Sequence, residues 1–105
     1  MSVNGAEIRL RIEMLLRAGP ANRTSDEEVE DALSAGYGYA LSLDAERVRM
    51  ERRITELAAQ AEEPEAATEL RRLWLRHRTL DNELGELRAK LGELRDAQLA
   101  ESESR

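Results

Sequence analysis

Arginines that gather around a single tryptophan are the residues of this chain best suited to chemistry. We call this set the Arg–Trp cluster, and its members are Trp74, Leu75, Arg52, Arg53, Arg71, Arg76 and Arg78. An exposed tryptophan among arginines is typical of the energetic centre of a protein interface. The same residue types can bind nucleic acid, because an indole stacks on bases while guanidinium groups bind phosphates. A solvated charged face with no partner is the third interpretation.

Catalysis and metal binding have less support in the sequence. The 22 Asp and Glu residues are expected on solvated helix faces, where nothing positions a pair of carboxylates for acid–base chemistry. The chain has no cysteine and one histidine, so we expect neither a thiol nucleophile nor a metal site. We predict no enzymatic activity and no cofactor. The less favoured alternative is a small all-helical enzyme of the chorismate-mutase kind, which also places arginines on long helices.

Composition and charge restrict the partners of the chain. Its 105 residues are 36% charged and 3% aromatic, which suits thin helical packing better than a thick globular core. The net charge of −6 argues against general nucleic-acid binding. No apolar run approaches the roughly 18–20 residues that span a bilayer, and no secretory signal is recognisable. We expect a cytoplasmic protein without membrane contact, and the excess of arginine over lysine favours a GC-rich bacterial genome.

Two long helices must position the Arg–Trp cluster. Apolar residues recur at alternating steps of three and four over 29–61 and again over 70–98. A helix with such a seam needs a partner helix. When the chain turns near 62–65, every member of one series faces a member of the other. The predicted fold is therefore all-α, a long antiparallel two-helix coiled-coil hairpin over 25–99.

The ends of the chain complete the predicted organisation. Residues 1–19 form a short amphipathic helix, with Gly19 and Pro20 as its stop signal. The alternation of apolar and charged residues over 7–14 also fits a strand, but a lone strand would have no partner in a helical chain. Residues 20–24 are predicted as a linker and residues 100–105 as a frayed tail.

Four residues interrupt the apolar seam or its helix. Arg47 and His77 stand where leucine is expected, so they either fix the register of the two helices or bind a ligand. Gly36 lies opposite Leu91 in the predicted pairing and permits a close approach of the helices. Gly38 is predicted to bend or pack the helix, or to face a ligand.

A second apolar stripe runs beside the seam. Its members are Tyr37, Leu41, Ala45 and Val48. A two-helix hairpin does not need this stripe, so another surface must cover it. The sequence leaves two alternatives: the N-terminal helix packs on the stripe, or a second copy or another partner does so.

The segment from Ala40-Leu41-Ser42 through the arginine-rich helix to Ile54 resembles the RsiG-type anti-sigma factors of actinobacteria over about fifteen residues. That family holds a sigma factor and a cyclic dinucleotide with a two-helix coil. Its ligand pattern is Glu, Ser, Arg, Gln and Asp, of which this chain matches only the serine, at Ser42. The resemblance therefore implies regulation of a partner by a small coil and does not extend to dinucleotide binding.

The function that the sequence favours is a non-enzymatic coiled-coil protein that regulates or tethers a protein partner. The alternative is an anti-sigma-like regulator that binds a nucleotide or nucleic acid through the Arg–Trp cluster. A homodimer is compatible with both.

The pairing of the two helices predicts a crosslink. Cysteines at Leu57 and Leu70 should form a disulfide within one chain on oxidation, because the two positions face each other across the seam. Non-reducing electrophoresis distinguishes this product from a disulfide-linked dimer. A crosslink that forms only between chains would instead indicate a parallel coil of extended helices.

Overall fold

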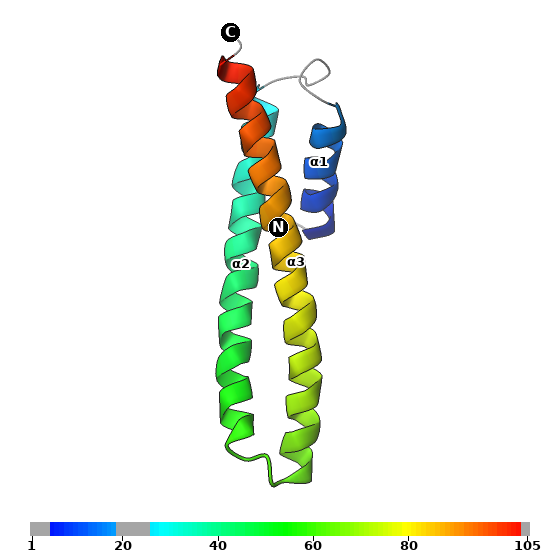
Figure 1. Cartoon of the computed structure of the whole chain (residues 1–105), viewed down its shortest axis with the longest axis vertical. Coiled ribbons are helices and arrows are strands. Elements are labelled where there is room, and N and C mark those ends of the chain that lie inside the picture. Colours follow the sequence, from blue (N-terminus) through cyan, green and yellow to red (C-terminus); the bar gives the residue numbers. More distant parts are fainter. Residues whose placement is uncertain (1–4, 19–25, 104–105) are drawn as a thin grey trace. The chain divides into compact units, whose positions relative to one another are not determined.

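The structure, a computed structural model, describes residues 5–18 and 26–103, and these residues are helical except for the turn at 59–63. It contains α1 (Gly5–Ala18), α2 (Asp26–Ala58) and α3 (Pro64–Glu103), and these described residues include no strand (Figure 1). The all-α prediction is confirmed, and the strand alternative for 7–14 is wrong because α1 covers these residues.

The helix ends differ in part from the predicted boundaries. The turn occupies 59–63, so α2 ends about one helical turn before the predicted point near 62. The carbonyl of Glu63 accepts a hydrogen bond from Ala67 N at 3.0 Å, and Pro64 fills the first helical position, where its missing N–H costs nothing. Helix α3 continues through 100–103 of the predicted tail. The predicted linker 20–24, the stop signal of Gly19 and Pro20, and residues 104–105 lie outside the described residues.

Two compact units make up the chain. The terminal unit comprises 1–40 and 86–105, and it contains α1, the first part of α2 and the last part of α3. The turn unit comprises 41–85, and it contains the second part of α2, the turn and the first part of α3. Both units draw on the same two long helices, because α2 and α3 each extend through both ranges.

The terminal unit is centred on Gly36. A Cβ atom at this position would overlap the side chain of Leu91 and would lie 3.1 Å from Cδ1 of Ile12. Leu91 and Ile12 are both fully buried, at 0% exposure. All three helices therefore meet at a point where only hydrogen fits, and the predicted close approach of Gly36 to Leu91 is confirmed. The other buried apolar residues of this unit are Ile8, Leu15, Val29, Ala32, Leu33, Ala40, Leu87 and Leu94.

Polar and aromatic contacts also hold α1 in the terminal unit. The ammonium of Lys90 donates a short, partly buried hydrogen bond to the carboxylate of Glu13. This bond, together with the positive charge of Lys90, holds the pKa of Glu13 below its ordinary value. The ring of Tyr39 lies against Gly5, in the space that a Cβ atom would occupy. Helix α1 thus contacts both α2 and α3.

The turn unit combines an apolar core with ion pairs between α2 and α3. Its buried apolar residues are Leu43, Met50, Ile54, Leu57, Ala66, Leu80 and Leu84. Arg47 forms an ion pair with Asp81 at 3.4 Å, and Nε2 of His77 is hydrogen-bonded to Glu51 at 3.0 Å. In a second set, Glu46 pairs with Arg76 at 3.9 Å and Arg53 with Glu69 at 3.3 Å. Within each set, the residue of α2 with the higher residue number bonds to the residue of α3 with the lower residue number.

The environments of two glycines on α2 predict opposite effects of the same substitution. Gly36→Ala should lower the free energy of unfolding by about 1–2 kcal/mol, because overpacking against Leu91 and Ile12 outweighs the better helix propensity of alanine. Gly38→Ala should raise it by up to about 1 kcal/mol, because nothing lies within 4 Å of a Cβ atom there. Urea denaturation of both variants measures the difference. Equal changes in the two variants would contradict the close contact at Gly36.

Candidate interaction surface

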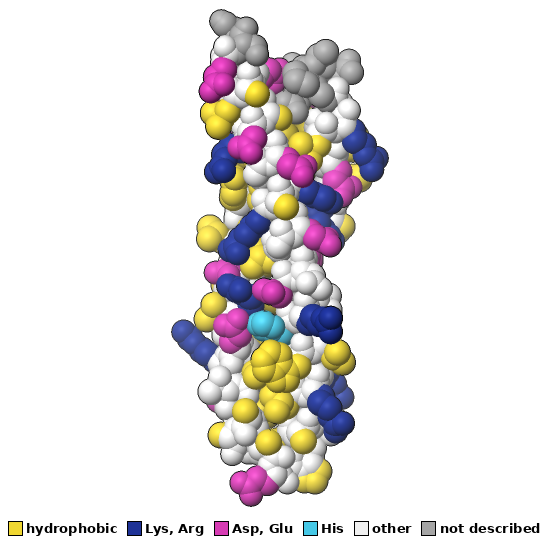
Figure 2. All heavy atoms as spheres, in the orientation of Figure 1, with side chains coloured by type: hydrophobic (Ala, Val, Ile, Leu, Met, Phe, Trp, Pro, Cys, Tyr) yellow, Lys and Arg dark blue, Asp and Glu magenta, His cyan; other side chains and the backbone are white. Residues whose placement is uncertain are grey.

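Two large apolar side chains of the turn unit are exposed next to each other on α3. Trp74 is 54% exposed and Leu75 is 68% exposed. Leu73 is partly buried and Leu80 is buried, so the face that α3 turns toward the core passes beside Trp74 and not through it. The indole contacts the His77 ring edge to face, with ring centroids 5.7 Å apart. Figure 2 shows hydrophobic side chains gathered next to the single histidine.

Exposed arginines lie one helical turn from these two apolar residues. Arg71 precedes Trp74 by three residues and Arg78 follows it by four, and these spacings make them neighbours on the helix surface. Arg72 has the same relation to Leu75. All three arginines are exposed and form no ion pair within the described part of the chain. We call Arg71, Arg72, Trp74, Leu75 and Arg78 the Arg–Trp patch.

The other arginines of the predicted cluster have different surroundings. Arg53 donates hydrogen bonds to Glu69 at 3.3 Å and to Glu56 at 3.2 Å, and these bonds raise its pKa above the ordinary value. Arg76 pairs with Glu46 across the two helices. Arg52 is exposed on α2. Of the predicted arginines, Arg71 and Arg78 lie one helical turn from Trp74, and Arg72 is exposed three residues before Leu75.

The second predicted interface is also exposed. Leu41 is 71% exposed, while Tyr37 and Val48 are 38% and 37% exposed. Of the apolar residues of α1, Ile12 lies against Gly36, whereas Leu10 and Met14 are exposed. Both alternatives for this stripe, coverage by the N-terminal helix and coverage by a second copy or another partner, remain predictions.

Arg47 and His77, the polar residues of the seam, place their polar ends beside carboxylates. Arg47 Nη2 lies 2.6 Å from Asp44 and Nη1 lies 3.4 Å from Asp81, while the Nε atom is buried without a hydrogen-bond partner. The hydrogen bond to Asp44 raises the pKa of Arg47 above its ordinary value. The side chain of His77 is 17% exposed and bonds to Glu51. Both residues extend from apolar positions to the polar edge, as long amphipathic side chains do.

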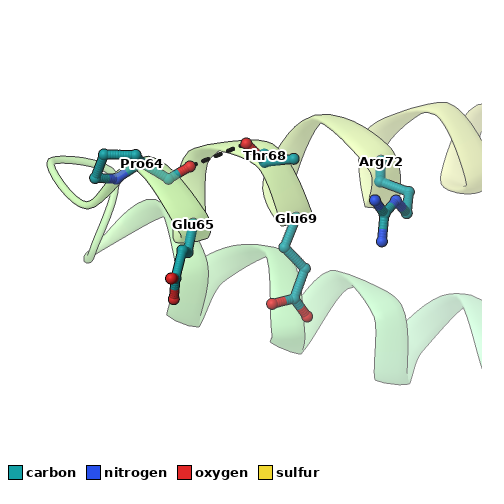
Figure 3. Close-up of a pocket in the computed structure, with 5 residues that line it drawn as sticks. All are labelled: Pro64, Glu65, Thr68, Glu69 and Arg72. Carbon is teal, nitrogen blue, oxygen red and sulfur yellow. Dashed lines mark hydrogen bonds between the residues drawn. The ribbon is translucent and has the colours of Figure 1, made fainter.

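Two hollows in the surface of the described residues are open to solvent and are lined by both polar and apolar atoms. One of about 420 Å³ is lined by Pro64, Glu65, Thr68, Glu69 and Arg72, all from the first turns of α3 (Figure 3). Thr68 already donates to the Pro64 carbonyl at 3.0 Å, and Glu69 is bonded to Arg53. The other, of about 430 Å³, lies at the Glu13–Lys90 pair in the terminal unit. Neither encloses a buried catalytic group.

Comparisons with known proteins do not identify a function for this surface. No protein-family model, curated protein or solved structure matches the chain. Among the described residues, no three His, Cys, Asp or Glu side chains are grouped so that they could hold a metal ion. Over the same residues, no helix is both long enough and apolar enough to cross a membrane. A functional assignment must therefore come from the Arg–Trp patch and its surroundings.

The exposure of Trp74 predicts a small effect of its removal on folding. Trp74→Ala should lower the free energy of unfolding by about 1 kcal/mol or less, because only the edge contact with His77 and a partial burial are lost. Leu84→Ala in the same unit, where the leucine is 1% exposed, should cost about 2–5 kcal/mol. Chemical denaturation compares the two. Equal losses would mean that Trp74 belongs to the core.

Proposed function

We propose that this chain is a non-enzymatic interaction protein whose Arg–Trp patch binds a protein partner. The observation that carries this proposal is the exposure of Trp74 and Leu75 between arginines that have no ion pair. A partner that covers the two side chains gains about 25 cal/mol for each Å² of apolar surface removed from water. Tryptophan and arginine are also the residue types that most often dominate binding energy at protein interfaces.

We propose further that α2 and α3 form an antiparallel coiled-coil hairpin that presents this patch. The contacts between the two helices support this arrangement. In each of the two sets of contacts, residues farther along α2 bond to residues nearer the start of α3. The buried residues Met50, Ile54 and Leu57 on α2 also keep the spacing of four and three that a coil requires. A patch on a preformed helix loses little conformational entropy on binding.

The role that fits these features is regulation or tethering of the partner in the cytoplasm. A nucleotide or nucleic acid is the alternative ligand, since the indole and the arginines could stack on a base and bind a phosphate. The net charge of −6 opposes a long polyanion. A second copy of the chain is a candidate occupant for the stripe of Tyr37, Leu41 and Val48, whose exposure supports an additional contact.

Site-specific photocrosslinking in cells of the source organism tests the partner proposal. Benzoylphenylalanine at Leu75 should form an adduct with one protein, and the same group at Ala89, an exposed position of α3 in the terminal unit, should not. Trp74→Ala should weaken binding of the identified protein by about 2 kcal/mol or more, which is roughly 30-fold in the dissociation constant. Leu99→Ala removes an apolar side chain of similar exposure, 55% against 54% for Trp74, from α3 in the terminal unit and serves as the matched control.

Two results would contradict the proposal. One is an adduct pattern that is the same at Leu75 and at Ala89. The other is an identified partner whose affinity is unchanged by Trp74→Ala while the variant remains folded. An adduct with nucleic acid instead of protein would favour the alternative ligand.

A further inference from the structure

We infer that the partner of the Arg–Trp patch presents a short acidic helix, with an apolar side chain on Trp74 and Leu75 and carboxylates on Arg71 and Arg78. This inference rests on the proposed function, and it adds the chemistry of the partner. It follows from how charges are distributed in the turn unit.

Four carboxylates of this unit bond to side chains of the other long helix. Glu69 bonds to Arg53 and Glu46 to Arg76. On the other flank, Glu51 bonds to His77 and Asp81 to Arg47. Arg71, Arg72 and Arg78 form no ion pair inside the described structure, so their guanidinium groups are available to a carboxylate of another molecule. A binding partner with carboxylates complements this surface.

The spacing of the arginines indicates the form of the partner. Arg71 and Arg78 are seven residues apart, so their Cα atoms are separated by about 10.5 Å along α3, or nearly two helical turns. A helix that lies alongside α3 matches this distance with two acidic residues that are also seven apart. A leucine between them, three or four residues from each, then sits over Trp74 and Leu75. The expected pattern in the partner is an acidic residue, a central apolar residue and a second acidic residue on one helix face.

The ends of the basic surface disfavour a long polyanion. Glu65 and Glu69 precede the patch on α3, and Asp81 follows it. A nucleic-acid strand that continued beyond the patch would pass these carboxylates, whereas stable nucleic-acid binding commonly uses about 6–10 phosphate contacts. An anionic bilayer meets the same obstacle, because it is wide compared with two turns of helix. A short acidic segment reaches the arginines without meeting the flanking acids.

A library of helical peptides displayed on phage, selected on the immobilised full-length chain, tests this inference. The recovered peptides should be enriched in pairs of Asp or Glu seven residues apart with a central leucine or other large apolar residue. Trp74 is the only tryptophan, so its emission reports binding of each synthesised peptide directly, if the peptide carries no tryptophan. Binding should weaken as salt rises, since charge pairs at an exposed surface are screened.

Charge reversal provides the decisive comparison. The double variant Arg71→Glu, Arg78→Glu should bind the selected acidic peptide at least about 10-fold more weakly and should recover lysine- or arginine-rich peptides in a new selection. The control Arg11→Glu, Arg49→Glu makes the same change in net charge at two other exposed arginines and should still select acidic peptides. Circular dichroism confirms that both variants remain helical.

Several outcomes would overturn the inference. One is a selection that returns no binder, or that returns neutral or basic peptides on the unchanged chain. Another is tighter binding, by Trp74 emission, of a twenty-residue oligothymidylate or of phosphatidylserine vesicles than of any acidic peptide. If crosslinking at Leu75 identifies a protein whose contact segment is not acidic, the inference fails while the proposed function stands. If no protein is crosslinked at Leu75, the proposed function itself fails.

Discussion

The burial of one apolar stripe on each long helix is the interaction on which the rest of the structure depends. On α3, Leu84, Leu87, Leu91 and Leu94 are all between 0% and 1% exposed. A helix buries such a stripe only along one face, so the residues on either side of the stripe lie at the surface or at the boundary between core and solvent. Trp74 is exposed for this reason, since its neighbour Leu73 occupies the inward position. The candidate interaction surface is thus a direct consequence of where the core lies.

The sequence predicted the helices well because their signals are periodic and local. The spacing of three and four identified both long helices, and it placed Gly36 opposite Leu91, where the structure brings them into contact. Boundaries were less accurate, because the end of a helix depends on a few weak hydrogen bonds. In the turn, the N–H of Gln60 donates to the carbonyl of Leu57 and not to the carbonyl four residues before it. No sequence pattern in 58–63 predicts this change of hydrogen bonding.

The sequence could not predict which arginines of the site form ion pairs with carboxylates. Arg53, Arg71, Arg76 and Arg78 are chemically identical, yet two of them bond to carboxylates and two do not. Which arginine finds a partner depends on its rotamer and on the flank of the helix that faces the other helix. Exposed pairs of this kind contribute only about 0.2–1 kcal/mol each. Their larger effect is to decide which positive charges remain uncompensated.

The sequence distance between contacting residues differs between the two units. Arg53 and Glu69 are 16 residues apart in the chain, whereas Glu13 and Lys90 are 77 apart. Closing the longer loop costs about 1.4 kcal/mol more in chain entropy, and contacts between distant residues form more slowly than local ones. Helix α1 is synthesised before α3, yet it can complete its contacts only after Lys90 and Leu91 have been added to the chain.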